Sequence, residues 1–161
     1  MKKKFRIIGI GLITLFIIIQ FFHPDKYNSA IDPAGDLIQF ASPPDQVATL
    51  LKNACYDCHS NQTVYPWYGR ISPASWFMDR HISKGREKMN LSEYGNTEKS
   101  DGIGLLVKIC EEVEDGSMPL KSYRLLHKKA RLTQEERSLI CDWTEKEAMK
   151  IIRGRPVETE E

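Results

Sequence analysis

One short motif has residue types and a spacing that define a chemistry: Cys55-Tyr56-Asp57-Cys58-His59. It reads C-x-x-C-H, the attachment sequence for a c-type haem. Positions i and i+3 of a helical turn face the same side, so the two thiols can each form a thioether with one haem vinyl group. The adjoining His59 then supplies the proximal imidazole to the iron. The motif predicts one covalently attached haem c per chain, bound through Cys55, Cys58 and His59.

Three other interpretations of the cysteine pair fit less well. A zinc site needs a second pair of ligands, and the remaining cysteines, Cys110 and Cys141, stand alone in the sequence. A thioredoxin-like redox pair needs a βαβ context, and the sequence shows none. A structural disulfide would not require the histidine. We therefore expect haem attachment at this motif.

The iron has a second axial position, and four side chains are candidates for it. Met118 lies in a Gly-Ser-Met-Pro segment between two predicted helices, and its thioether would raise the reduction potential relative to a second histidine. His81 is the alternative, although a lone histidine on an apolar helix face is more often a core residue. We interpret Met78 as core packing and His127, which has basic neighbours, as a surface residue. Met118 is thus the predicted distal ligand, and an open site is the remaining possibility.

The motif must be positioned by helices. Apolar residues recur at helical spacing, and we expect helices over residues 43–59, 73–89, 98–114 and 134–151. Ser42 and Ser72, each followed by proline, are predicted N-caps, and Thr133 to Glu136 is a predicted capping box. No stretch alternates convincingly at a period of two. The prediction is an all-α domain of about four helices around one covalent haem.

An aromatic segment follows the motif, from Val64 to Gly69. It could cover one haem face, and one of its carbonyls, that of Pro66 for instance, could accept the second ring N–H of His59. Ordinary loop packing is the equal alternative. On the next predicted helix, Trp76, Arg80 and Arg86 are long enough to reach haem propionates, although the arginines are more simply solvated.

Cys110 and Cys141 lie on the apolar faces of two predicted helices. In an oxidising compartment, two spare thiols on neighbouring helices can form a disulfide. Free buried cysteines are the alternative. The sequence leaves the choice open.

The N-terminus carries a targeting or anchoring signal. Four basic residues within the first six positions precede an apolar run over residues 7–22 that only Gln20 interrupts. At 1.5 Å per residue, the run spans about 24 Å, slightly less than a bilayer core. A poor and late cleavage site favours an uncleaved anchor over a cleaved signal peptide. We expect a single-pass helix in the inner membrane, with the haem domain on the periplasmic side.

Length and charge set the domain organisation. The chain has 161 residues and a formal net charge of +1, which suggests one domain plus appendages and gives no electrostatic footprint for nucleic acid. We divide it into an anchor or signal over 1–24, a linker over 25–41, a haem-binding domain over 42–152 and a charged tail over 153–161.

These residues resemble the small bacterial haem-binding domain family of cytochrome-c-like proteins, over nearly the whole chain. The resemblance is carried by the haem motif with the following Ser60-Asn61, by Tyr65-Pro66-Trp67-Tyr68 and by Gly116-Ser117-Met118-Pro119. It implies one covalent haem on an exported α-helical domain, bound by Cys55, Cys58 and His59. Met118 follows from the Met-Pro loop that cytochromes c use for the distal ligand. The resemblance names no redox partner.

The expected function is electron transfer, because a haem with both axial positions filled by protein moves one electron without binding a substrate. The alternative is a haem-based sensor or peroxidase-like protein with an open or displaceable sixth position. No nucleophile–base pair or phosphate loop is visible, so a non-enzymatic role is favoured. The expected partners are haem, a membrane through the N-terminal helix and a redox protein of unknown identity.

Overall fold

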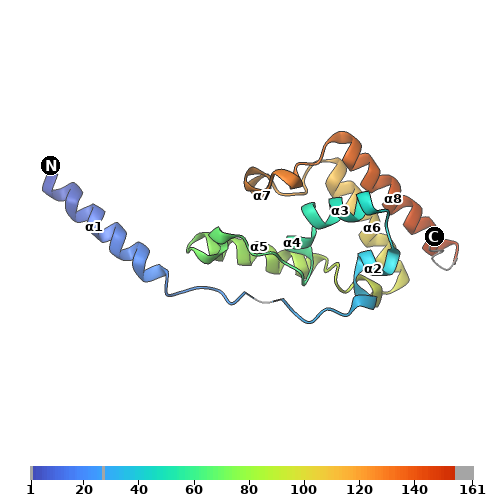
Figure 1. Ribbon diagram of the computed structural model, residues 1–161, viewed down its shortest axis with the longest axis horizontal. Coiled ribbons are helices and arrows are strands. Elements are labelled where there is room, and N and C mark those ends of the chain that lie inside the picture. The colour runs from blue at the N-terminus through green and yellow to red at the C-terminus, as the bar shows by residue number, and fades with distance from the viewer. Residues whose placement is uncertain (1, 27, 155–161) are drawn as a thin grey trace.

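The computed structural model describes residues 2–26 and 28–154, and this part of the chain is helical (Figure 1). It contains eight α-helices, four short 3-10 turns and no strand, which confirms the predicted all-α class. The α-helices are α1 (Lys2–Ile19), α2 (Leu37–Ala41), α3 (Asp45–Ala54), α4 (Tyr56–His59), α5 (Ala74–Lys88), α6 (Lys99–Glu114), α7 (Lys121–Leu126) and α8 (Gln134–Ile152). The 3-10 turns are η1 (Pro33–Gly35), η2 (Trp67–Arg70), η3 (Tyr94–Asn96) and η4 (Lys128–Ala130).

The helices expected over 73–89, 98–114 and 134–151 correspond to α5, α6 and α8. The one expected over 43–59 is divided into α3 and α4 at Cys55, whose φ of −119° departs from helical values. The short helices α2 and α7 were not predicted, because five and six residues are too few to show an apolar period.

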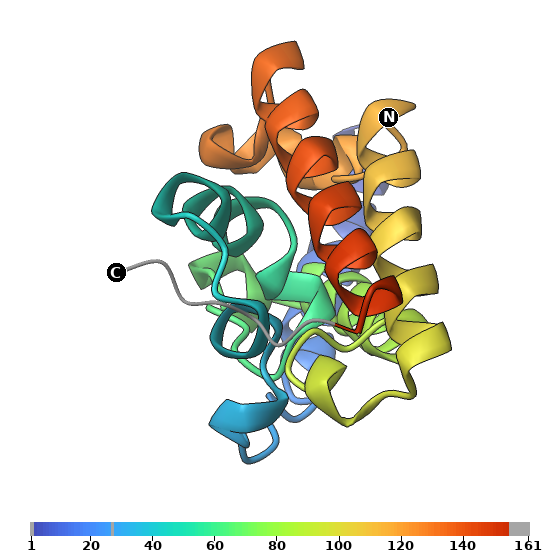
Figure 2. The ribbon, with the colours of Figure 1, turned by 90° about the vertical axis from the view of Figure 1, so that its right-hand side faces the viewer.

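The core is built on α6 and α8, which lie side by side along their length (Figure 2). Helix α3 packs against α8 and supplies the third part of the core. The buried apolar side chains of these three helices are Val47, Leu50, Leu51, Leu106, Ile109, Val113, Ile140, Trp143 and Ala148. Removing them from water stabilises the arrangement. Helix α6 therefore contributes Leu106, Ile109 and Val113 to the core.

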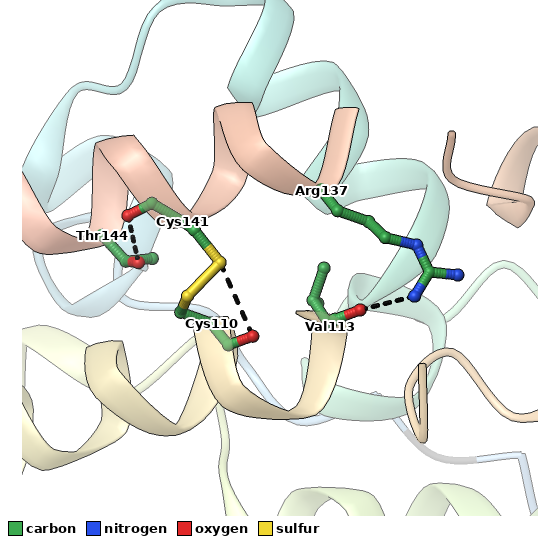
Figure 3. Close-up of a disulfide and its surroundings, with 5 residues drawn as sticks. All are labelled: Cys110, Val113, Arg137, Cys141 and Thr144. Atoms are coloured by element: carbon green, nitrogen blue, oxygen red, sulfur yellow. Dashed lines mark hydrogen bonds between the residues drawn. A yellow bond between two sulfur atoms is a disulfide. The ribbon is translucent and has the colours of Figure 1, made fainter. Parts of the chain in front are cut away.

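A disulfide joins α6 to α8 between Cys110 and Cys141, with an S–S distance of 2.05 Å (Figure 3). Of the two outcomes that the sequence left open, the structure contains the bridge. Nearby, Arg137 Nη1 of α8 donates to the Val113 carbonyl at 2.7 Å, close to the C-terminal end of α6. The two core helices are thus held together by a covalent bond, a hydrogen bond and apolar packing.

The predicted caps have mixed outcomes. Thr133 forms the predicted capping box with Glu136 at the start of α8. Ser42 is not the N-cap of α3: it ends α2 with a φ of 44°, and α3 begins after Pro44 without a side-chain cap. Ser72 is not a cap either, because its hydroxyl bonds Ser75 and the Phe22 carbonyl. Both corrections arise because these serines contact elements that the local pattern did not reveal.

Half of the expected linker is folded into the domain. Asp36 caps α2 by accepting hydrogen bonds from the Ile38 and Gln39 N–H groups, and Leu37 is fully buried. Tyr56, inside the haem motif, donates its hydroxyl to Asp36 Oδ1 at 3.0 Å. Residues 33–41 of the expected linker therefore form η1 and α2, and hydrogen bonds join Asp36 and the start of α2 to Tyr56 of the haem motif.

Helix α1 carries the N-terminal apolar run and none of its residues is buried. It ends at Ile19, short of Phe22, where the apolar run ends. Within residues 2–26 and 28–154, no helix combines the length and the apolar content that crossing a bilayer requires, so the expected transmembrane helix is not supported. Most of the expected tail, residues 155–161, lies outside the described part of the chain.

Candidate haem-binding site

The haem motif forms the turn at which α3 passes into α4. The N–H groups of Cys58 and His59 both donate to the Cys55 carbonyl oxygen, at 3.1 and 2.9 Å. These bonds place both thiols and the imidazole within one helical turn, as the spacing predicted. The two cysteines are half-buried and are not joined to each other. The turn therefore carries the three groups that the sequence predicts to bind haem.

The surroundings of the thiols favour uncharged sulfur. Burial raises the pKa of the Cys55 thiol to about 12, with a further contribution from Cys58. Burial also raises the pKa of the Cys58 thiol to about 11, and the Asp57 carboxylate adds to this. Zinc sites and redox-active pairs depend on thiolates and hence on a lowered pKa. A thioether is uncharged, so this environment suits haem attachment better than thiolate chemistry.

No metal-binding cluster forms around the motif among the described residues. The group of ligand-type side chains that lies within reach of a common ion is Cys110, Glu114 and Cys141. Its two sulfurs are already consumed in the disulfide. The structure therefore gives no second ligand pair to the motif, and the zinc interpretation is not supported there.

His59 is oriented by a carbonyl that the sequence did not indicate. Its Nδ1 lies 3.2 Å from the Met89 carbonyl oxygen, and since a carbonyl only accepts, Nδ1 carries the proton. Nε2 keeps its lone pair, which an iron ligand needs. Burial lowers the pKa of His59 and so favours this neutral form.

The carbonyl suggested for this role, that of Pro66, instead accepts from the Gly69 N–H at 3.0 Å. Met89 takes its place because the chain after α5 turns back along α4. There the Leu91 N–H donates to the His59 carbonyl at 2.6 Å. The His59 imidazole is therefore oriented by the backbone that follows α5, and not by the aromatic segment over residues 64–69.

Cys55 and His59 line a pocket of about 800 Å³. This volume lies within the range of about 300–1,000 Å³ that is typical of cofactor sites. Its wall is largely apolar and comes from α3, α6 and the segment after α5: Ala54, Met89, Leu105, Ile109 and Val113. Met118 and Pro119 complete the lining. A histidine, a thiol and a thioether thus meet in one apolar cavity, and these groups fit a haem.

The chain brings Met118 into this pocket by reversing direction after α6. Gly116 has a φ of +75°, a conformation that glycine adopts without steric cost. The Met118 N–H then donates to the Glu112 carbonyl at 2.8 Å, so the segment runs back beside α6. The predicted distal ligand therefore shares a pocket with the predicted proximal ligand.

The other candidates for the distal position do not line this pocket. His81 packs its ring on Phe77 of its own helix, with centroids 4.2 Å apart, and its Nδ1 lies 2.7 Å from the Phe77 carbonyl. Met78 lies against Gly69. His127 is half-buried, with Nε2 2.6 Å from the Tyr68 hydroxyl, so its interpretation as a surface residue was wrong. The pocket brings Met118 alone of the four to His59.

Charged residues that were not predicted from the sequence line the pocket. Lys88 and Lys108 are among its lining residues, and Lys108 forms an ion pair with Glu112 at 3.3 Å. Arg86, which the sequence suggested for the propionates, instead donates from Nε to the Ser60 carbonyl at 2.8 Å and holds the loop after the motif. Lys108 and Glu112 could have been found from their four-residue spacing along the pocket face of α6.

Helix α7 is hydrogen-bonded to the turn formed by residues 55–59, here called the haem turn. Tyr123 donates its hydroxyl to Asp57 Oδ2 at 2.6 Å and stacks on His127, with ring centroids 4.0 Å apart. Burial, followed by the hydrogen bond to Asp57, raises the pKa of Tyr123, so it remains a donor at neutral pH. Since α7 follows Met118 closely in the chain, this contact restrains the Met118 segment.

Gly104 lies on the pocket face of α6, where an added β-carbon would meet open space. We expect Gly104→Phe to fill the pocket and abolish haem attachment. Gly104→Ala should keep the haem and stabilise α6 by about 1 kcal/mol, because alanine favours a helix more than glycine does. Haem staining of both variants on one denaturing gel measures the effect. Equal staining of both would place the haem elsewhere.

Gly85 lets α5 cross the haem turn at close range. An added β-carbon would lie 2.5 Å from the Cys58 carbonyl oxygen, which belongs to the backbone and cannot rotate away. We expect Gly85→Ala to lower the free energy of unfolding by about 1–3 kcal/mol, as overpacking does. Urea unfolding beside Gly104→Ala gives a matched comparison. A gain in stability at both positions would contradict the close contact.

Comparison with known proteins places this site in a family. Residues 14–146 match the family model described as a haem-binding domain. No curated protein and no solved structure matches the chain. The matched range includes the haem motif, the whole of α6 and the Met118 segment. The chain therefore belongs to the haem-binding domain family.

Proposed function

We propose that this haem-binding protein is a one-electron carrier of the cytochrome c type. Its haem is attached through Cys55 and Cys58, and its iron is held by His59 and Met118. The observation that supports this proposal is the shared pocket, in which Cys55, His59 and Met118 line one apolar cavity of about 800 Å³. Met118 reaches this cavity from a distant part of the sequence.

The bound haem supplies a one-electron change between ferric and ferrous iron. The protein's residues tune and protect that change. The neutral imidazole of His59 is held through Nδ1 by the Met89 carbonyl. The thioether of Met118 is soft and uncharged, so it favours the ferrous state. Leu105, Ile109 and Val113 give the cavity an apolar wall, which limits the solvent that must reorganise when the charge changes.

We also propose that the domain is exported and that α1 associates with the inner membrane, with the haem on the periplasmic side. Thioether attachment of haem takes place outside the cytoplasm, which supports export. Helix α1 begins with basic residues, and its apolar side chains, such as Phe5 and Ile13, are exposed over more than half of their surface. No packing partner within the described chain covers them.

The test is to express the full chain in a bacterial host that attaches haem c, together with the double variant Cys55→Ala and Cys58→Ala. We expect the first protein to keep one haem per chain through denaturation and the variant to lose haem staining. The holoprotein should give a low-spin spectrum and titrate reversibly with one electron. Intact mass of polypeptide alone would reject covalent attachment. A high-spin ferric spectrum with immediate cyanide or CO binding would favour the sensor or peroxidase-like alternative.

A further inference from the structure

Residues 20–22, which follow α1, are hydrogen-bonded to the start of α5. Gln20 Nε2 donates to the Ser72 carbonyl at 2.9 Å, and Gln20 Oε1 accepts from the Ser72 N–H at 3.0 Å. The Phe22 carbonyl accepts from Ser72 Oγ at 3.2 Å and from Trp76 Nε1 at 2.6 Å. The end of the apolar N-terminal run is therefore bonded directly to the start of α5, with no free linker between them.

Large apolar side chains are exposed on the two segments that these bonds join, residues 21–22 and 64–77. They are Phe21, Phe22, Val64, Trp67, Ile71, Trp76 and Phe77, here called the aromatic face. Phe21 is 81% exposed and Trp67 is 74% exposed, although both are large and apolar. In Figure 1 the start of α5 forms the end of the domain nearest α1. Exposed apolar groups of this size mark an interaction surface.

Basic residues occur in or close to the same two segments of the chain. Lys26 Nζ lies 5.7 Å from the centroid of the Tyr65 ring, which is a cation–π distance. Arg70 ends η2 beside the face, and its carbonyl lies 3.1 Å from His23 Nε2. Tryptophan, Lys and Arg are common in protein segments that contact lipid headgroups, because the indole has both an apolar ring and a polar N–H group.

We propose that the aromatic face rests on a lipid bilayer surface, with Trp67 and Trp76 among the headgroups. This rests on the proposed association of α1 with the membrane. The reason is geometric: α1 is the uncovered apolar helix of the chain, and its C-terminal extension is bonded to this face. Any lipid that α1 enters must therefore adjoin the face. The end of the domain built on α6 and α8 then points away from the bilayer (Figure 1).

Hydroxyl-radical footprinting of the haem-loaded full chain on vesicles of phosphatidylcholine and phosphatidylglycerol tests this placement. Trp67 on the face and Leu125 on α7 are both 74% exposed and form a matched pair. Each labelling rate is divided by the rate of the same residue in the urea-unfolded chain. We expect the normalised rate of Trp67 to fall several-fold below that of Leu125, and Phe16 of α1 to be protected as well.

Three outcomes would overturn the proposal. If Phe16 is protected while Trp67 is labelled as freely as Leu125, α1 binds lipid but the face does not. If neither is protected, the proposed membrane association fails and the inference fails with it. If Trp67 becomes protected only after a membrane protein extract is added, the face binds a protein partner instead.

A variant checks that the hydrogen bonds between residues 20–22 and the start of α5 cause the placement. Gln20→Ala combined with Trp76→Phe removes the hydrogen bonds of both side chains. We expect Trp67 labelling to rise to the Leu125 level while Phe16 stays protected and the haem spectrum is unchanged. Gln46→Ala, an exposed glutamine on α3, is the matched control and should leave Trp67 protected. Unchanged protection in the double variant would reject the role of these bonds.

Discussion

Replacing Met118 with alanine should convert a low-spin haem spectrum into one dominated by high-spin iron. Alanine has no donor atom, so water or an exogenous ligand would take the distal position. The reduction potential should fall by an amount on the order of 0.1 V, within the ~0.8 V range that axial ligands set. Visible spectroscopy and a potentiometric titration of the purified holoprotein measure the two effects.

Met78→Ala is the matched control for this result. Met78 is also half-buried, but it lies against Gly69 and does not line the pocket. We expect its spectrum and potential to stay close to those of the parent protein. If Met118→Ala leaves the spectrum unchanged, Met118 is not the ligand. A change in His81→Phe would then favour the alternative that the sequence offered.

Removing the disulfide with Cys110→Ala and Cys141→Ala should lower the free energy of unfolding by about 3–4 kcal/mol. The bridge closes a loop between residues 31 positions apart, and the chain-entropy model assigns a loop of that length this stabilisation. The effect should be global, because α6 carries both core residues and the pocket wall. Urea unfolding of the oxidised parent and the double variant measures the difference.

The parent protein reduced with dithiothreitol is the matched control, because it lacks the bridge without any change of sequence. We expect it to unfold near the double variant. With all samples compared in the ferrous state, the haem spectrum of both below the transition should match the parent spectrum, since neither cysteine lines the pocket. An unfolding midpoint that does not move in either sample would show that packing of α6 on α8 suffices without the bridge.

Much of the site follows from local sequence. The C-x-x-C-H spacing places two thiols and an imidazole on one helical turn. The hydrogen bonds that form this turn join residues three and four positions apart. The capping box at Thr133 and the three long helices α5, α6 and α8 are likewise set by local hydrogen bonding and apolar period. Met118 was predicted from ligand chemistry and from a family resemblance, and it lines the same pocket as His59.

The tertiary structure decided the parts that depend on contacts between distant segments. The carbonyl that orients His59 comes from Met89, because α5 returns along the haem turn, and no local pattern shows that return. The Cys110–Cys141 bridge exists because burial of apolar faces lays α8 along α6. The spacing of residues in the sequence determines which side chains lie together on one turn, because short-range hydrogen bonds form the turn. Which distant segments come into contact is determined by the burial of apolar surface over the whole chain. No local sequence pattern shows this.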